Sequence, residues 1–484
     1  MPTNFSAASV PVSRRRLLAL PAAAAAAVTA PLLGPDSASA AGTCAPRHLV
    51  DPGLAEPVGR AYHYLDVVQD AYVKGGEPRL LQSYNNESEL MTTAFVYDNA
   101  LAALAYLANP TVANVRRARL IGDALLWIQA NDERYADGRV RQAYAAGPMR
   151  FYGGGPYFPG LKREDGKAAF LWPFGFGGSS TGDMAWVALA LAQLYVDTRI
   201  TKYLDGAVAL GHWIAARESP YHFGGYHGGV QGDGETAQPW SSTEHNIDAY
   251  GLFTLLAKLT RDRRWKARAG VAEDFVRAMW NRAGRFFWTG TLGGLAGEDP
   301  NLVNTGNLPE DVQTWALLSL GDERHNAAVD WVTGNLWNTD GAVSGVTYSS
   351  QAKTITGPIA GSTLPNNRDA VWLEGNGHLA LALLKRNERG DAALARRLLR
   401  QTTVAQQSLG AGHTVGLTAD EDNGKLSNPG EGGTWTGTPL PARSGIVAAT
   451  SPFDTGFAFG YFTRQHVGAT SWFAMAAQNF NPYR

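Results

Sequence analysis

Carboxylates recur through the sequence at positions from which they could act together as acids and bases. Five apolar segments, each long enough for a helix, carry an acid near their start, and these acids are Asp98, Asp183, Asp248, Asp311 and Glu374. They follow one another at intervals of 85, 65, 63 and 63 residues, about one helical hairpin with its loop. The helix dipole and capping explain any one of them structurally. Five in register predict a shared pocket, because their mutual repulsion costs stability unless function requires it.

The third of these segments carries a second acid. Glu244 lies four residues before Asp248 on the same helix face, next to His245, in a segment that is otherwise apolar. This polar stripe indicates that the helix face lines a pocket. Ser241-Ser242-Thr243-Glu244 also has the spacing of a capping box, in which the glutamate folds back onto a serine N–H, so a capping role stays open.

Glu374 lies in the segment Val371-Trp372-Leu373-Glu374-Gly375-Asn376-Gly377-His378. The two glycines cost about 1 kcal/mol each relative to alanine inside a helix, so close packing or a nearby ligand must compensate. We expect Glu374 to be functional. The alternative is a buried glutamate held by His378, one turn away on the same face, or by Arg368.

Pro309-Glu310-Asp311 opens the fourth segment, with proline where a missing N–H is harmless. One acid can cap while the other faces inward, and Asp311 shares a face with Trp315. We expect the catalytic acids to be Glu244, Asp311 and Glu374, with Glu374 or Glu244 as proton donor and Asp311 as base. The expected sugar-binding residues are Asp98, Asp183, Asp248, His245, Trp240, Trp172 and His378, of which Asp183 is the one most easily explained as a plain N-terminal acid.

Other chemistries lack their sequence patterns. The glycine-rich runs have no phosphate-loop context, and no G-x-S-x-G nucleophile elbow occurs. The histidines have no HExxH-type spacing, and Cys44 is the only cysteine, so we expect neither a metal, a disulfide nor another cofactor. Long aromatic and glycine-rich segments, such as residues 221–227 and 453–462, suit a glycan cleft, because sugar rings stack on aromatic planes. They could equally be loops that pack into the toroid and close one end of it.

The acid-bearing segments are apolar on nearly all sides, which a helix enclosed by other helices requires. Amphipathic segments alternate with them and are expected to be outer helices: Leu54 to Val73, Val112 to Ala130, Tyr203 to Arg217, Trp265 to Asn281, His325 to Trp337 and Ala392 to Leu409. With a sixth inner segment at residues 470–474, twelve helices form six hairpins. We therefore predict an all-α fold, an (α/α)6 toroid. Its long outer-to-inner loops, including residues 131–181 and 410–468, should gather with the acids at one mouth.

Residues 1–41 have the features of an export signal. Ser13-Arg14-Arg15-Arg16-Leu17-Leu18 precedes an Ala/Leu-rich core, and Ala38-Ser39-Ala40 offers a cleavage site. The paired arginines resemble a twin-arginine (Tat) signal, which implies the Tat export machinery as partner, although an ordinary secretory signal is the alternative. We expect a secreted protein with one toroid domain, residues 42–484. The net charge is −1 for the whole chain, which fits neither a nucleic-acid nor an anionic-membrane partner, and no second membrane span is expected.

The repeat architecture, with blocks such as Tyr97-Asp98-Asn99-Ala100-Leu101-Ala102 and Thr243-Glu244-His245-Asn246-Ile247-Asp248-Ala249-Tyr250, resembles the six-hairpin glycosidase superfamily over essentially the whole chain after residue 41. The resemblance implies catalytic acids at the N-terminal mouth of an (α/α)6 barrel. The leading hypothesis is a glycoside hydrolase acting on a carbohydrate by paired carboxylates, with inversion.

Two other functions stay open. A lyase or unsaturated uronyl hydrolase would need cations at the mouth, for which the candidates are Arg150, Lys162, Arg163, Arg368 and Arg443. A non-catalytic glycan-binding envelope protein is the third possibility.

Overall fold

Two kinds of helix alternate along the chain in the computed structural model, and they differ in how much of their surface is buried. The structure describes residues 49–85, 90–150, 157–170, 176–416 and 437–484, all of which belong to the unit 42–484. Six helices are buried nearly all round: α2 (Val96–Ala108), α4 (Thr181–Thr198), α6 (Thr243–Thr260), α8 (Glu310–Leu320), α10 (Leu373–Arg386) and α13 (Val467–Ala477). The other six bury one stripe: α1 (Ala55–Asp70), α3 (Val112–Ala130), α5 (Thr201–Ala215), α7 (Arg263–Ala278), α9 (Ala327–Asn335) and α11 (Asp391–Leu409).

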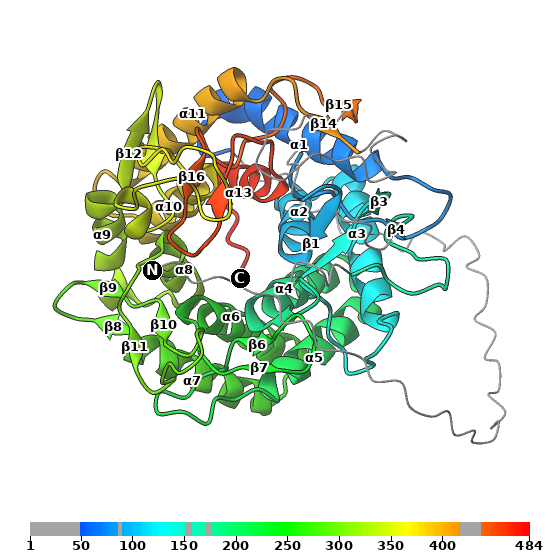
Figure 1. Cartoon of the computed structure of the whole chain (residues 1–484), viewed down its shortest axis with the longest axis horizontal. Helices are drawn as coiled ribbons and strands as arrows, with labels where there is room; N and C mark the ends of the chain where they lie inside the picture. Colours follow the sequence, from blue (N-terminus) through cyan, green and yellow to red (C-terminus); the bar gives the residue numbers. More distant parts are fainter. Residues whose placement is uncertain (1–48, 86–89, 151–156, 171–175, 417–436) are drawn as a thin grey trace. The chain divides into compact units, whose positions relative to one another are not determined.

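The buried helices form a closed inner ring. Each contacts the next in chain order, and α13 contacts α2 to complete the circle. Each outer helix packs against the inner helix that precedes it, and α1 packs against α13 (Figure 1). Outer helices pack on the ring through one apolar stripe, and α7 is an example. Its buried residues recur at helical spacing and are Trp265, Ala269, Ala272, Phe275 and Val276. The predicted (α/α)6 toroid is therefore confirmed.

The connections at the two ends of the ring differ in length. Inner helices pass to outer ones through short turns, and α8 ends at Gly321, which has the left-handed φ of 66° that glycine adopts without strain. Connections from outer to inner helices are long, and they hold all the strands that the structure describes. As predicted, these loops and the inner-helix N-termini lie at the same mouth.

The strands are short and form local pairs within these loops. They are β1 (Thr93–Phe95) with β2 (Ala143–Ala145), β3 (Met149–Arg150) with β4 (Tyr157–Phe158), β5 (Ser179–Ser180) with β6 (Gly229–Val230) and β7 (Ala237–Gln238), β8 (Trp280–Asn281) with β9 (Phe286–Phe287), β10 (Gly290–Thr291) with β11 (Val303–Asn304), β12 (Trp337–Asp340) with β13 (Val343–Val346), β14 (Thr414–Val415) with β15 (Thr438–Pro439), and β16 (Phe453–Asp454) with β17 (Gly460–Tyr461). Three 3-10 helices, η1 (Pro52–Leu54), η3 (Glu323–His325) and η4 (Gln351–Lys353), complete the described elements.

Two expected outer helices end early, and a strand takes their last residues. Trp265 to Asn281 was expected as one helix, but α7 ends at Ala278 and Trp280–Asn281 is β8. His325 to Trp337 was expected as one helix, but His325 ends η3, α9 ends at Asn335, and Trp337 pairs with Val346 in the β12–β13 hairpin. Gly334 is a poor helix former and weakens the end of α9. The residues that follow pair as strands instead of continuing the helix.

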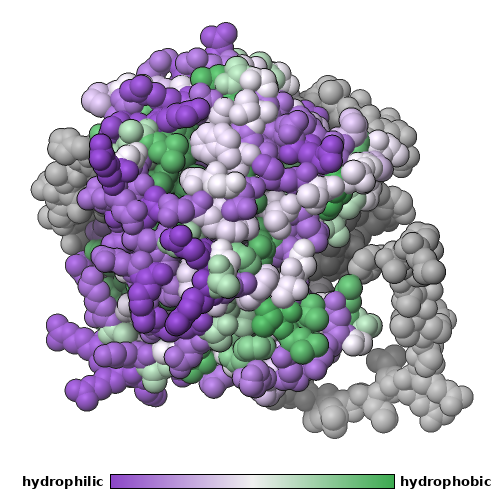
Figure 2. All heavy atoms as spheres, turned by 90° about the vertical axis from the view of Figure 1, so that its left-hand side faces the viewer, coloured by the Kyte–Doolittle hydropathy of each residue, from purple (hydrophilic) through white to green (hydrophobic). Residues whose placement is uncertain are grey.

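The outer surface is polar where the outer helices face water. Figure 2 shows the side of α9 and the β8–β11 hairpins, which is mainly hydrophilic with apolar residues gathered toward its lower edge. Among the helices that the structure describes, none has the length and apolar run that crossing a membrane requires. The expected signal, residues 1–41, lies outside the described residues, so its cleavage stays a prediction.

Candidate functional site

A cavity of about 690 Å³ opens among the N-terminal ends of the inner helices. Each of the first five inner helices places a carboxylate on its wall, and His466, directly before α13, occupies the sixth position. The acids are Asp98, Asp183, Glu244, Asp311 and Glu374. The structure thus brings together all three acids that the sequence nominated as catalytic.

Glu374 contacts one side chain from a neighbouring inner helix, α2, and one from its own helix, α10. The Tyr97 hydroxyl donates to Glu374 Oε1 at 2.7 Å, and it accepts a hydrogen bond from Trp472 Nε1 at 3.0 Å. Because an indole N–H only donates, the single hydroxyl hydrogen of Tyr97 is left for Glu374. Burial alone would raise the pKa of Glu374, but contacts with His378 and the nearby His466 outweigh it and lower that pKa. Glu374 is therefore a carboxylate.

The glycines of this helix are explained by close packing. A Cβ on Gly377 would meet Trp472 at 3.0 Å, and one on Gly375 would meet Trp372 at 2.5 Å. Of the two partners considered for Glu374, His378 is the one that contacts it, at 3.6 Å between Nε2 and Oε1.

Glu244 and Asp311 differ from Glu374 in electrostatics. Burial, with the charges of Asp311 and other acids, raises the pKa of Glu244 well above its usual value. Burial and the charge of Glu310 raise the pKa of Asp311 to about 7. Of the three acids nominated as catalytic, one is therefore kept charged and two have a raised pKa.

The capping alternative for Glu244 is not the one that the structure adopts. The N-cap of α6 is Ser242, whose hydroxyl accepts from the His245 N–H. The Ser241 N–H donates to Thr291 Oγ1 at 2.9 Å, so it is not bound by the glutamate. Glu244 is partly exposed on the cavity wall instead.

The remaining predicted residues divide between the wall and the layer beneath it. Trp240 and His245 line the cavity, and burial lowers the pKa of His245 to about 4, which makes its ring neutral at pH 7. Asp183 also lines it, and the hydroxyl of the N-cap residue Ser180 donates to its Oδ2 at 2.7 Å. Burial raises the pKa of Asp183 to about 7.

Two of the predicted substrate contacts lie beneath the wall. Asp248 and His378 are fully buried and are absent from the described cavity lining. Asp248 Oδ1 accepts from the Tyr483 hydroxyl at 2.7 Å, and His378 is paired with Glu310. We therefore do not propose direct substrate contact for either. Trp172 lies outside the described residues.

His466 was missed in the sequence. Its Nε2 lies 3.0 Å from Asp98 Oδ1, and its Nδ1 accepts the Ala469 N–H that caps α13. Tyr84 stacks on its ring at 4.0 Å between centroids. The signal was available, because the sixth inner segment lacks an acid and a histidine stands where the other segments carry one.

Aromatic rings form the floor and one side of the cavity. Trp186 and Trp315 contact each other at 5.1 Å between ring centroids beneath the acids. On the side, Trp372 stacks on Tyr461 at 5.9 Å, and Phe459 beside them is 41% exposed. The 453–462 segment thus contributes a wall of the cavity, which suits stacking on sugar rings.

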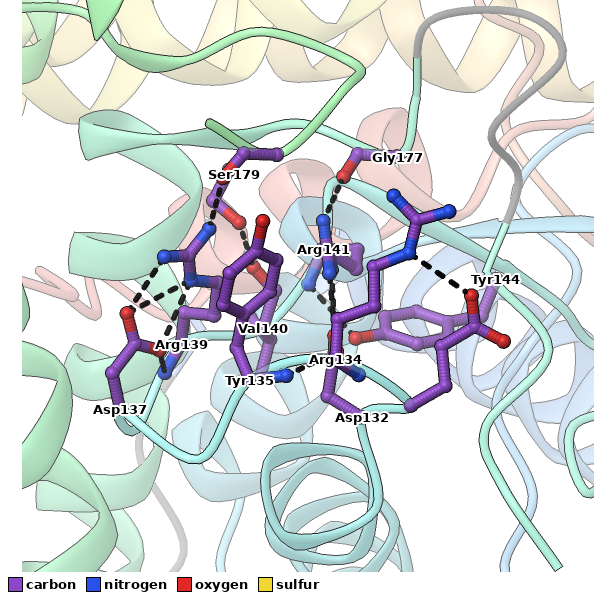
Figure 3. Close-up of polar contacts among 12 residues, drawn as sticks. Asp132, Arg134, Tyr135, Asp137, Arg139, Val140, Arg141, Tyr144, Gly177 and Ser179 are labelled. Carbon is purple, nitrogen blue, oxygen red and sulfur yellow. Dashed lines mark hydrogen bonds and ion pairs between the residues drawn. The ribbon is translucent and has the colours of Figure 1, made fainter. Parts of the chain in front are cut away.

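Another part of the wall is braced by buried arginines in the loop between α3 and α4 (Figure 3). Arg141 binds Asp132 through two N–H groups, at 2.6 and 3.0 Å, and both side chains are 1% exposed. Its third contact, to the Gly177 carbonyl at 2.7 Å, fixes the chain next to Gly178, which lines the cavity. Ser179 is held in turn by its bond to the Val140 carbonyl.

The described wall carries no lysine or arginine. Of the cations considered for an anionic substrate, Arg163 pairs with Glu133 and Asp165, and Lys162 pairs with Glu77. Arg368 and Arg443 are exposed away from the wall, and the side chain of Arg150 is not described. Within the described ranges, no group of three or more His, Cys, Asp or Glu side chains is arranged to hold a metal ion.

Comparison with protein-family models gives no match, and comparison with curated proteins gives none either. Solved structures do match. Cellobiose 2-epimerase from Bacillus thermoamylovorans is 9% identical with a TM-score of 0.54, covering 87% of this chain and 98% of that one. A family 76 glycoside hydrolase from a bovine Bacteroides thetaiotaomicron strain is 13% identical with a TM-score of 0.52, covering 87% and 77%. A family 76 mannosidase from Bacteroides thetaiotaomicron is 11% identical with a TM-score of 0.51, covering 88% and 98%. At these identities the likeness shows the shared fold alone.

Proposed function

We propose that this protein is a secreted glycoside hydrolase that cleaves a neutral glycan in the cavity. The observation that carries the proposal is that two carboxyl groups line the same cavity in different surroundings: Glu374 beside Tyr97 and His378, and Glu244 near other acids. Glu374 is kept charged, whereas Glu244 has a raised pKa within the same cavity. A carboxylate and a protonated carboxyl group facing one substrate are what acid/base glycoside hydrolysis uses.

The roles follow from exposure and charge. Glu244 is partly exposed on the wall and gives its proton to the glycosidic oxygen as the bond to the anomeric carbon breaks. Glu374 takes a proton from the water that attacks that carbon. The base proposed here is therefore Glu374 in place of Asp311, because the pKa of Asp311 is raised. Direct attack by water inverts the anomeric configuration.

The charge of the wall favours a neutral over an anionic substrate. Among the described lining residues the acids outnumber the two histidines, and no lysine or arginine is present. A uronic-acid polymer would bring like charges together without compensation. Aromatic rings and carboxyl groups can bind the faces and hydroxyls of neutral sugars.

Substitution of the proposed acid and base tests this assignment. Glu374→Gln and Glu244→Gln should each lower kcat by about 10²-fold or more, the usual contribution of a positioned acid or base. Asp391→Asn, on the outer helix α11, is the matched control and should keep wild-type kcat. Circular dichroism checks that each variant is folded. Near wild-type turnover by both glutamine variants would refute the assignment.

One observation favours a second candidate, sugar epimerisation. His466 holds Asp98 on the wall, and an imidazole can move the proton that lies next to a sugar carbonyl. The fold likeness to a cellobiose 2-epimerase is compatible with this activity. Incubation of reducing disaccharides in D₂O, followed by NMR, distinguishes the two. Deuterium at C2 with an intact glycosidic bond would support the epimerase.

A further inference from the structure

The side chains directly beneath Glu374 form a buried line of alternating charge. His378 Nδ1 lies 3.0 Å from Glu310 Oε2, and His378 Nε2 lies 3.6 Å from Glu374 Oε1. His378 and Glu310 have no exposed side-chain surface, and the side chain of Glu374 is 2% exposed. The line joins two inner helices, because Glu310 starts α8 while the other two lie on α10.

The geometry places His378 where two carboxyl groups favour its doubly protonated form. A neutral imidazole has one N–H and one acceptor nitrogen, whereas an ionised carboxylate only accepts. Nδ1 of His378 lies within hydrogen-bond distance of Glu310, whereas Nε2, at 3.6 Å, makes no hydrogen bond to Glu374. An imidazolium therefore acts on Glu374 through its charge and stands beside two carboxyl groups that favour it. Burial lowers the pKa of His378, but Glu310 and Glu374 outweigh it and raise that pKa to about 9.

Capping of α8 does not explain why a glutamate stands at position 310. The N-cap of α8 is Pro309, which makes no side-chain cap, and the adjacent Asp311 accepts the Val312 N–H at 2.6 Å. Asp311 faces the cavity, whereas Glu310 reaches sideways to α10. A buried acid at this position costs stability unless a cation compensates its charge.

We propose that Glu310 and His378, neither of which is among the described residues that line the cavity, are positioning residues that keep Glu374 charged. The proposal rests on Glu374 as the base of the proposed function. With His378 beneath Oε1 and Tyr97 donating to the same oxygen, Oε2 is left without a hydrogen bond in the described structure. Oε2 is itself buried and lies 3.6 Å from His466 Nδ1.

Other titratable groups surround Glu310, His378 and Glu374, and their charges also act on the pKa values of these three side chains. His466 and Asp98 lie on the α13 and α2 side of Glu374, with Tyr97 between them. Asp311 of α8 and Glu244 of α6 also act on it from across the cavity. Trp472, Trp315 and Trp372 enclose the His378 ring at 4.4 to 5.0 Å between centroids and keep water from it.

The test does not depend on finding a substrate. In the full-length protein labelled with ¹⁵N-histidine, the His378 ring signals are assigned from their loss in His378→Asn. They should show both nitrogens protonated at pH 7, with titration near pH 9. In Glu310→Gln the midpoint should fall by at least about one unit, a tenfold change in proton affinity. A neutral wild-type His378 at pH 7 would overturn the proposal even if the protein proved to be a hydrolase.

The kinetic consequence has a definite sign. Loss of the Glu310 charge weakens protonation of His378, so the pKa of Glu374 rises and the acid limb of the kcat profile moves to higher pH. The control Asp391→Asn also removes a buried carboxylate, but it should leave the limb in place. An unmoved limb in Glu310→Gln, with the protein folded, would overturn the proposal. Absence of turnover on every sugar would instead count against the proposed function alone.

Discussion

Arg141 allows a stability prediction worked directly from the structure. Its guanidinium makes two bonds to Asp132 and one to the Gly177 carbonyl, and it is 1% exposed. Arg141→Met fills similar space but leaves the Asp132 carboxylate in the interior without its cation. Breaking a buried pair in this way costs about 3–5 kcal/mol in unfolding free energy. Asp132→Asn keeps an acceptor but leaves the buried guanidinium without its counter-charge, so we expect a loss of similar size.

Urea denaturation followed by circular dichroism measures both changes. Arg264→Ala is the control, because its ion pair with Asp262 is on the surface and the arginine side chain is 77% exposed. We expect no measurable change in that variant. The pKa of Asp132 is lowered, since the bonds from Arg141 and backbone N–H groups outweigh its burial. The stabilisation is therefore present at neutral pH and lost as the pH falls below the usual aspartate range. A loss below about 1 kcal/mol in Arg141→Met would refute the reasoning.

Two further predictions concern α10 and its surroundings. Tyr97→Phe removes the hydroxyl that donates to Glu374, so the pKa of Glu374 should rise and the acid limb of the kcat profile should move upward, measured from pH–rate curves. An unchanged limb would argue against this bond. Gly377→Ala should destabilise by about 1–3 kcal/mol through its contact with Trp472, despite the better helix propensity of alanine. Gly270→Ala in α7, where an added Cβ meets nothing within 4 Å, should stabilise by up to about 1 kcal/mol. Thermal unfolding of the two variants should show shifts of opposite sign.

The fold could be predicted from the sequence because the two helix classes have different apolar patterns. The apolar stripe of α7 and the nearly uniform apolar character of α4 can both be recognised in the amino-acid sequence. Val112–Ala130 matches the prediction at both ends. The β12–β13 hairpin was missed although its strands are adjacent in sequence, because Trp337 was assigned to the preceding amphipathic helix.

The candidate site could be predicted only in part. The sequence identified the acids, but an inner helix is buried on all sides, so periodicity does not show which residues face the cavity. Asp248 and His378 therefore appeared as substrate contacts although they lie beneath the wall. The charge of Glu374 depends on Tyr97 and on Glu310 through His378, and no spacing in the sequence reveals those contacts between helices.

The most direct test of the central claim is product analysis with the protein lacking residues 1–41. It would be incubated with a panel of neutral and anionic polysaccharides, and the anomeric configuration of newly released reducing ends would be followed by ¹H NMR. We predict release from a neutral glycan with inverted configuration, and loss of that release in Glu374→Gln. An unsaturated product from a uronic-acid polymer, or binding without any release beyond the Glu374→Gln background, would contradict the account.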